Sequence, residues 1–190
     1  MTFLATYNKK FVHLINTFDQ KQFDACERSI KLCSERGGKV ILAGNGGSAA
    51  IACHIAVDFS RSCSIRAVNF NEADLITCYA NDYGYENWIK EALRSYADPK
   101  DLVILISSSG NSQNIVNAAK YCNSKNIDLL TFSGFSEKNE LNGLGKVNVW
   151  INSNYYNFVE MAHHLFLVAL VDSISLGREF VEKSRSKAIR

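Results

Sequence analysis

The sequence has little net charge and a single proline, Pro99, in 190 residues. Its 21 basic and 19 acidic residues leave a net charge of +2, and they are mixed along the chain, so no field of one sign favours nucleic acid or an anionic membrane as a partner. Lys9 and Lys10 interrupt the N-terminal stretch, and no run approaches the roughly 20 apolar residues that a bilayer span needs. We therefore expect a cytoplasmic protein that contacts neither nucleic acid nor membrane.

The chain also lacks closely spaced cysteine pairs. Such pairs are typical of metal sites and of redox motifs, and their absence leaves isolated thiols. We expect these cysteines to be reduced and to behave as small hydrophobic residues. The six are Cys26, Cys33, Cys53, Cys63, Cys78 and Cys122.

The length and the 47% hydrophobic composition predict one globular domain over residues 1–190. Residues 2–36 contain neither glycine nor proline and carry apolar residues at helical spacing, so we expect two helices that break near Phe18 and Asp19. These helices precede any strand that they could cover. We expect the segment 1–36 to pack against another subunit as an oligomerisation segment.

Strands and helices alternate in the rest of the sequence. Apolar runs predict strands at 39–43, 65–70, 102–106, 127–132 and 146–151, and helical patterns follow most of them. Short connections of this kind predict an α/β fold, a three-layer sandwich around a five-stranded parallel sheet. We expect a polar loop over 133–145, a long C-terminal helix over about 158–180, and a basic, frayed tail over 182–190.

Two glycine- and serine-rich turns follow apolar strands, GNGGS at 44–48 and SSSGNS at 107–112. In an open parallel sheet, ligands bind at the carboxyl ends of the strands, where both turns fall. Glycines at 44, 46 and 47 allow positive φ and close approach of backbone N–H groups to an oxyanion, which indicates a phosphate site. Neither the dinucleotide fingerprint nor a Walker loop is matched, so we expect no nucleotide cofactor.

The second turn adds hydroxyl groups to this predicted site. Four serines suit a phosphomonoester that must bind and leave, although a serine here could also simply cap the helix that follows. The hydroxyl groups belong to Ser107, Ser108, Ser109 and Ser112.

Two helices carry a histidine and a carboxylate four residues apart, and each such pair shares one helix face. The pairs are His54 with Asp58, and Glu160 with His164. Two histidines and two carboxylates could hold zinc or act as a base and an acid. The alternatives are that His163 and His164 lie in the core or in an interface, and that Asp58 is a solvated carboxylate.

These motifs resemble the SIS (sugar isomerase) domain family, and within it the phosphoheptose isomerases. The similar features are the leading helices, GNGGS with the histidine after it, AND at 80–82 with GYE at 84–86, ISSSGNS, and the long last helix. The resemblance implies a homotetramer whose active sites are lined by more than one subunit. It also implies conversion of sedoheptulose 7-phosphate to a manno-heptose 7-phosphate for bacterial surface polysaccharide.

The same resemblance assigns roles to residues. Ser48 and the four serines of the second turn would bind the phosphate. The sugar would be bound by Asn45, Gly46, Gly47, Asn81, Asp82 and Glu160.

Three positions depart from the family pattern. Asp58 stands where the family has glutamate, Glu160 where it has glutamine, and Val168 where it has a catalytic histidine. His164 lies one helical turn before Val168 and could reach the same pocket, so we expect Asp58 and His164 to be the catalytic pair. The alternatives belong to another class: a non-catalytic SIS tetramer that assists a replication initiator protein, or a sensor of a sugar phosphate.

Overall fold

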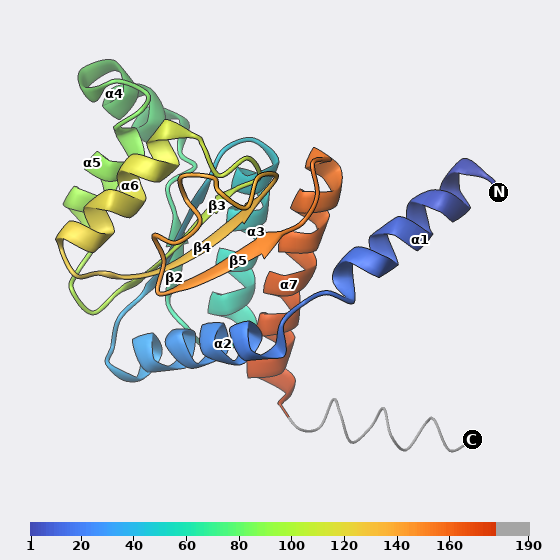
Figure 1. Cartoon of the computed structure of the whole chain (residues 1–190). Helices are drawn as coiled ribbons and strands as arrows, with labels where there is room; N and C mark the ends of the chain where they lie inside the picture. The colour runs from blue at the N-terminus through green and yellow to red at the C-terminus, as the bar shows by residue number, and fades with distance from the viewer. Residues whose placement is uncertain (178–190) are drawn as a thin grey trace.

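The computed structural model describes residues 1–177 and has a five-stranded parallel sheet at its centre (Figure 1). The strands lie in the order β2-β1-β3-β4-β5, and every neighbouring pair is parallel. The predicted α/β fold with a five-stranded parallel sheet is confirmed. The strands are β1 (Val40–Gly44), β2 (Ala67–Asn69), β3 (Leu102–Ser107), β4 (Asp128–Gly134) and β5 (Val147–Ile151).

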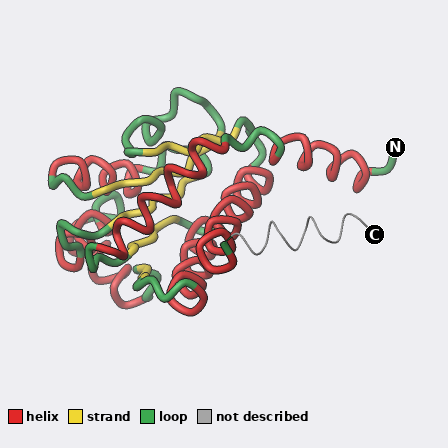
Figure 2. Tube along the Cα trace, turned by 90° about the horizontal axis from the view of Figure 1, so that it is seen from below, coloured by secondary structure: helices red, strands yellow, loops and turns green. Residues whose placement is uncertain are grey.

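Helices cover both faces of the sheet (Figures 1 and 2). One layer contains α2 (Gln20–Glu35), α3 (Gly47–Ser62) and α7 (Tyr156–Leu176), and the other contains α4 (Ala73–Tyr83), α5 (Trp88–Tyr96) and α6 (Gln113–Ser124). Alternate residues of β1 serve the two layers: Val40 and Leu42 pack in the first, Ile41 and Ala43 in the second. Apolar residues in unbroken succession are what a sheet covered on both sides requires.

The helix α1 (Phe3–Ile15) stands away from this body (Figure 1). Leu14 is its one buried residue, whereas Phe3 is 84% exposed. The ring of Tyr7 meets that of Phe158 at the start of α7, with centroids 4.6 Å apart. The two predicted helices are therefore present, and their role in oligomerisation stays a prediction.

The helix α7 has 21 residues and contains an 18-residue window with a mean hydropathy of 1.4, so by length and composition alone it could cross a membrane. Core helices share these properties, and α7 packs beside α3 with Phe166, Leu167 and Leu170 buried. The two helices run in the same direction, because Cys63 near the end of α3 donates to the carbonyl of Val171 near the end of α7. The predicted end of this helix near residue 180 and the basic tail over 182–190 lie outside the described residues.

Two predicted boundaries were wrong. The strand expected at 65–70 is shorter, because Ile65 donates to the carbonyl of Phe59 and closes the end of α3. The loop expected from residue 133 begins later, because Ser133 and Gly134 continue β4 and pair with β5.

All six cysteines are free, as predicted. Cys26 and Cys122 lie in the two core clusters, where burial raises the pKa of each thiol to about 12. Cys33 is buried as well, but Cys53 and Cys63 are partly exposed and Cys78 is exposed, so burial accounts for half of the set.

Candidate functional site

The two glycine- and serine-rich turns meet at the carboxyl ends of β1 and β3, which are neighbours in the sheet. Between them lies a cavity of about 110 Å³. The five serines predicted to bind phosphate all line it, together with Asn45. The sequence-based assembly of both turns into one site therefore agrees with the geometry. The full lining is Asn45, Ser48, Ile106, Ser107, Ser108, Ser109, Ser112, Tyr156 and Glu160.

The three glycines of the first turn serve different purposes. Gly46 alone among them has positive φ, at 54°. At Gly44 a Cβ would lie 2.7 Å from the backbone of Ser48, so glycine is needed there for room. At Gly47 a Cβ would lie 2.6 Å from Cδ of Glu160. Of the two properties that the sequence suggested for these glycines, positive φ is used at Gly46 alone, whereas Gly44 and Gly47 are closely approached by other atoms.

The serines of the second turn present hydroxyl groups to the cavity. Ser107 donates to Ser112, with 3.3 Å between the two Oγ atoms, and accepts from the N–H of Gly110. Ser108 is buried, and its Oγ has no hydrogen-bond partner in the described part of the chain. A buried hydroxyl group without a partner is costly unless something binds it. Ser112 precedes α6 as its N-cap residue but makes no side-chain capping bond, so capping does not account for these serines.

Three helices begin at this cavity: α3 near Ser48, α6 after Ser112, and α7 at Tyr156. None of them has a side-chain hydrogen bond at its N-cap. The positive ends of the helix dipoles, together with free backbone N–H groups, attract an anion. Within residues 1–177, Glu160 is the one charged side chain in the lining.

Two polar residues near the cavity were missed by the sequence analysis. The amides of Asn45 and Asn114 bond reciprocally, at 2.9 and 2.8 Å, and Tyr85 donates to Asn45 Oδ1 at 3.1 Å. Asn114 is buried, and together these bonds fix the orientation of Asn45. A buried asparagine two residues after Ser112 interrupts the apolar side of α6, and that interruption is the signal that could have identified it.

A chain of three side chains crosses from α3 to α7. Nε2 of His54 lies 3.1 Å from Oδ2 of Asp58, and Nδ1 of His54 lies 2.7 Å from Nε2 of His164. The side chain of His54 is 51% exposed and that of Asp58 is 21% exposed. Partial burial, followed by the facing His54, lowers the pKa of His164, and Asp58 acts in the opposite direction. The two predicted histidine and carboxylate helices therefore do meet at His54 and His164.

His163 is a core residue, as one of the alternatives proposed. Its Nε2–H donates to the carbonyl of Ser133 at 3.0 Å, and its ring meets Phe132 edge to face. Burial lowers its pKa to about 4. Val168, the position at which the resemblance implied a histidine, packs against the same apolar cluster. Neither residue faces the cavity.

Asn81 and Asp82, predicted to bind the sugar, are exposed on α4 and bond to each other. Neither is among the residues that line the cavity. Their predicted role would require them to face the site of another subunit.

The four residues predicted to bind zinc do not converge as a ligand set. Both ring nitrogens of His54 are directed at other side chains at hydrogen-bond distance, and residues 1–177 hold no group of three or more His, Cys, Asp or Glu placed to bind a metal ion. Zinc ligands would instead surround a common point about 2 Å from each donor. Zinc stays a prediction, which metal analysis of the purified protein before and after chelation would test.

Comparison with known proteins places these features in context. A family model described as SIS domain matches residues 6–134. The phosphoheptose isomerase of Syntrophotalea carbinolica is 30% identical over 179 residues, covering 86% of this chain and 89% of that protein. Phosphoheptose isomerase 2 of Campylobacter jejuni is 34% identical over 155 residues, covering 77% of each chain. The solved phosphoheptose isomerase structure from Neisseria gonorrhoeae aligns with a TM-score of 0.81 at 23% identity, over 90% of this chain and 97% of that one.

Proposed function

This chain belongs to the SIS domain family, and on that basis we propose that it isomerises a sugar phosphate, converting sedoheptulose 7-phosphate to D-glycero-D-manno-heptose 7-phosphate for bacterial surface polysaccharide. Similarity to phosphoheptose isomerases over most of the chain supports the reaction type. The observation that carries the proposal is the serine-lined cavity at three helix N-termini, with the hydroxyl group of Ser108 buried and without a partner.

The phosphate of the substrate would occupy this cavity. Hydroxyl groups of the five serines would donate to its oxygens, and the helix dipoles would balance its charge. Because the cavity holds about 110 Å³, the sugar chain must extend out of it. Glu160 and His164 follow one another by one turn along α7, so the sugar carbons would pass the carboxylate before they reach the imidazole.

Isomerisation moves a proton between adjacent carbons through an enediol, and the chain from Asp58 to His164 can supply the base. A carboxylate only accepts hydrogen bonds, so Nε2 of His54 carries the hydrogen and its Nδ1 is bare. Nε2 of His164 must then be the donor in the 2.7 Å contact, which leaves Nδ1 of His164 with a free lone pair. Its lowered pKa keeps this imidazole neutral near pH 7. We assign His164 as the base and Asp58 as the group that fixes the tautomers.

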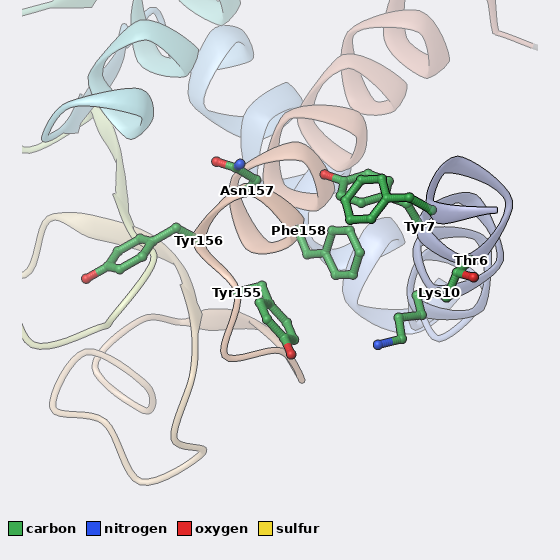
Figure 3. A pocket seen from close by; sticks show the side chains of 8 residues that line it. Thr6, Tyr7, Lys10, Tyr155, Tyr156, Asn157 and Phe158 are labelled. Carbon is green, nitrogen blue, oxygen red and sulfur yellow. The ribbon is translucent and has the colours of Figure 1, made fainter.

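We also propose that the protein is a homotetramer in which α1 packs on other subunits. An apolar cavity of about 360 Å³ lies between α1 and the start of α7. Figure 3 shows Tyr7 and Lys10 of α1 on one side of it and Tyr155 with Phe158 on the other. Exposed Phe3 adds to this surface, which a partner would cover. Mass measurement in solution tests the tetramer.

The isomerase proposal is tested by NMR of sedoheptulose 7-phosphate incubated with the protein in deuterated water. An enediol mechanism exchanges the transferred proton with solvent, so the aldose product should carry deuterium at C2. Unphosphorylated sedoheptulose should not react, because the cavity would then be empty. If the phosphorylated sugar binds but is never converted, the non-catalytic alternatives replace the isomerase.

A further inference from the structure

The carboxylate of Glu160 places a negative charge in the wall of a cavity whose other features attract anions. It lines the cavity with five serines, and it lies against Gly47 at the start of α3, where a Cβ would come within 2.6 Å of its Cδ. Among residues 1–177, the lining contains no lysine, arginine or histidine to balance it. A bound phosphate would therefore meet a like charge in the wall of its own site.

Glu160 also has nothing to bind in the unliganded chain. Across residues 1–177 its carboxylate takes part in no hydrogen bond and no ion pair. Two of the polar side chains in the lining are occupied otherwise: Asn45 is bonded to Asn114, and Ser107 is bonded to Ser112. An ionised carboxylate only accepts hydrogen bonds, so a ligand that places a donor hydroxyl group beside Glu160 would supply the partner that the carboxylate lacks within residues 1–177.

We propose that Glu160 determines the specificity of this cavity by favouring a phosphoester whose carbon chain carries hydroxyl groups over a bare inorganic anion. A bare dianion gains the serine hydroxyl groups and the helix dipoles but is repelled by the carboxylate. A polyol phosphate suffers the same repulsion and offsets it with a hydroxyl group that donates to Glu160. The proposal rests on the phosphate site proposed above and names the feature of the ligand that the site selects.

Selection of this kind would matter because the serine-lined cavity alone recognises only the anion. Sulfate and a phosphoester present similar oxygens to the hydroxyl groups and backbone N–H groups around the cavity. The carboxylate adds a requirement outside the anion itself, on the sugar carbons that leave the cavity. Inorganic anions would therefore compete poorly with the sugar phosphate.

The test compares the dissociation constants of sulfate and sedoheptulose 7-phosphate by calorimetry at pH 8, with a chelator present so that no cation bridges the charges. Glu160→Gln keeps the shape of the side chain and removes its charge. We expect it to bind sulfate about tenfold more tightly, while sedoheptulose 7-phosphate changes less, so the preference for the sugar phosphate falls about tenfold. Glu137→Gln, an exposed carboxylate outside the cavity, is the matched control and should leave both constants unchanged.

Two outcomes would contradict the proposal in different ways. If Glu160→Gln leaves the preference unchanged while the parent protein binds the sugar phosphate, this proposal is overturned and the phosphate site stands. If the parent protein binds neither compound, the proposed function fails, and the inference fails with it. Thermal unfolding of each variant shows whether a changed affinity reflects a changed fold.

Discussion

The Nδ1 atom of His54 lies 2.7 Å from the Nε2 atom of His164, so two imidazoles that are 110 residues apart in the chain are hydrogen-bonded to each other. This contact joins α3 to α7 on the layer of the fold that also holds Glu160. A histidine on α7 thus reaches a histidine on α3 that is itself paired with Asp58. Substitution of Asp58, the carboxylate that pairs with His54, tests whether this contact contributes to the proposed catalysis.

Asp58→Asn should lower kcat by about a hundredfold with little change in KM. The amide can donate to Nε2 of His54, which reverses its tautomer and leaves His164 without an acceptor. Asp58→Glu keeps the carboxylate and should retain most of the activity. Steady-state kinetics with sedoheptulose 7-phosphate measure both, and Asp172→Asn, an exposed carboxylate on α7, is the control. Full activity in Asp58→Asn would remove Asp58 from the mechanism.

Ser108→Ala should weaken sugar phosphate binding about tenfold without destabilising the protein. The Oγ atom is buried and makes no bond in the described chain, so its removal loses no internal contact and relieves a desolvated hydroxyl group. Calorimetric binding and thermal unfolding report the two effects separately. Ser124→Ala, which loses a bond on the surface, should leave binding unchanged. A lower melting temperature with normal binding in Ser108→Ala would contradict the assignment.

Gly44→Ala and Gly47→Ala should differ although they lie in one turn. The new Cβ at position 44 would meet backbone atoms of Ser48 at 2.7 Å, and such overpacking costs about 1–3 kcal/mol of the free energy of unfolding. At position 47 it would meet the end of the flexible Glu160 side chain, which can move aside. Chemical denaturation should therefore show a loss for Gly44→Ala and near-parent stability for Gly47→Ala. Equal losses would mean that the Glu160 side chain is rigidly held.

The free energy of unfolding should fall as pH drops from about 6.5 towards 4. Burial lowers the pKa of His163 from 6.5 to about 4. Between these values the His163 imidazole is protonated in the unfolded chain but stays neutral in the folded chain. The contribution of His163 is fully present above pH 6.5, and its loss approaches about 3 kcal/mol at pH 4. Denaturation at several pH values measures the slope. His163→Gln should reduce it, whereas the exposed His13→Gln should not.

The sheet and the meeting of the two serine-rich turns could be predicted from the sequence because both depend on local patterns. The apolar runs at β1 and β3 end at the GNGGS and SSSGNS turns, and parallel strands necessarily bring such turns to one edge. The two N-terminal helices could be predicted in the same way, from the helical spacing of apolar residues and the lack of glycine. The predicted ends of strands were wrong where a single hydrogen bond sets the end of an element, as when Ile65 bonds to Phe59 and closes the end of α3.

The contacts between α3 and α7 could not be predicted, because they depend on how two distant helices lie against each other. Spacing along one helix placed His54 near Asp58, but nothing in the sequence states that Glu160 rests against Gly47. The same limit applies to Asn114 and Tyr85, which reach Asn45 from α6 and from the loop before α5.

The order in which the parts of the cavity occur along the chain bears on its synthesis. Residues 44–48, 107–112 and 156–160 all contribute to it, so a nascent chain has made three strands before the last serine appears and all five before Glu160 does. No ligand can therefore assist the early stages of folding, and binding reports on a chain whose sheet is already complete. Truncation before α7 should abolish binding of the sugar phosphate, because it removes Tyr156 and Glu160 from the cavity and eight buried residues from the fold.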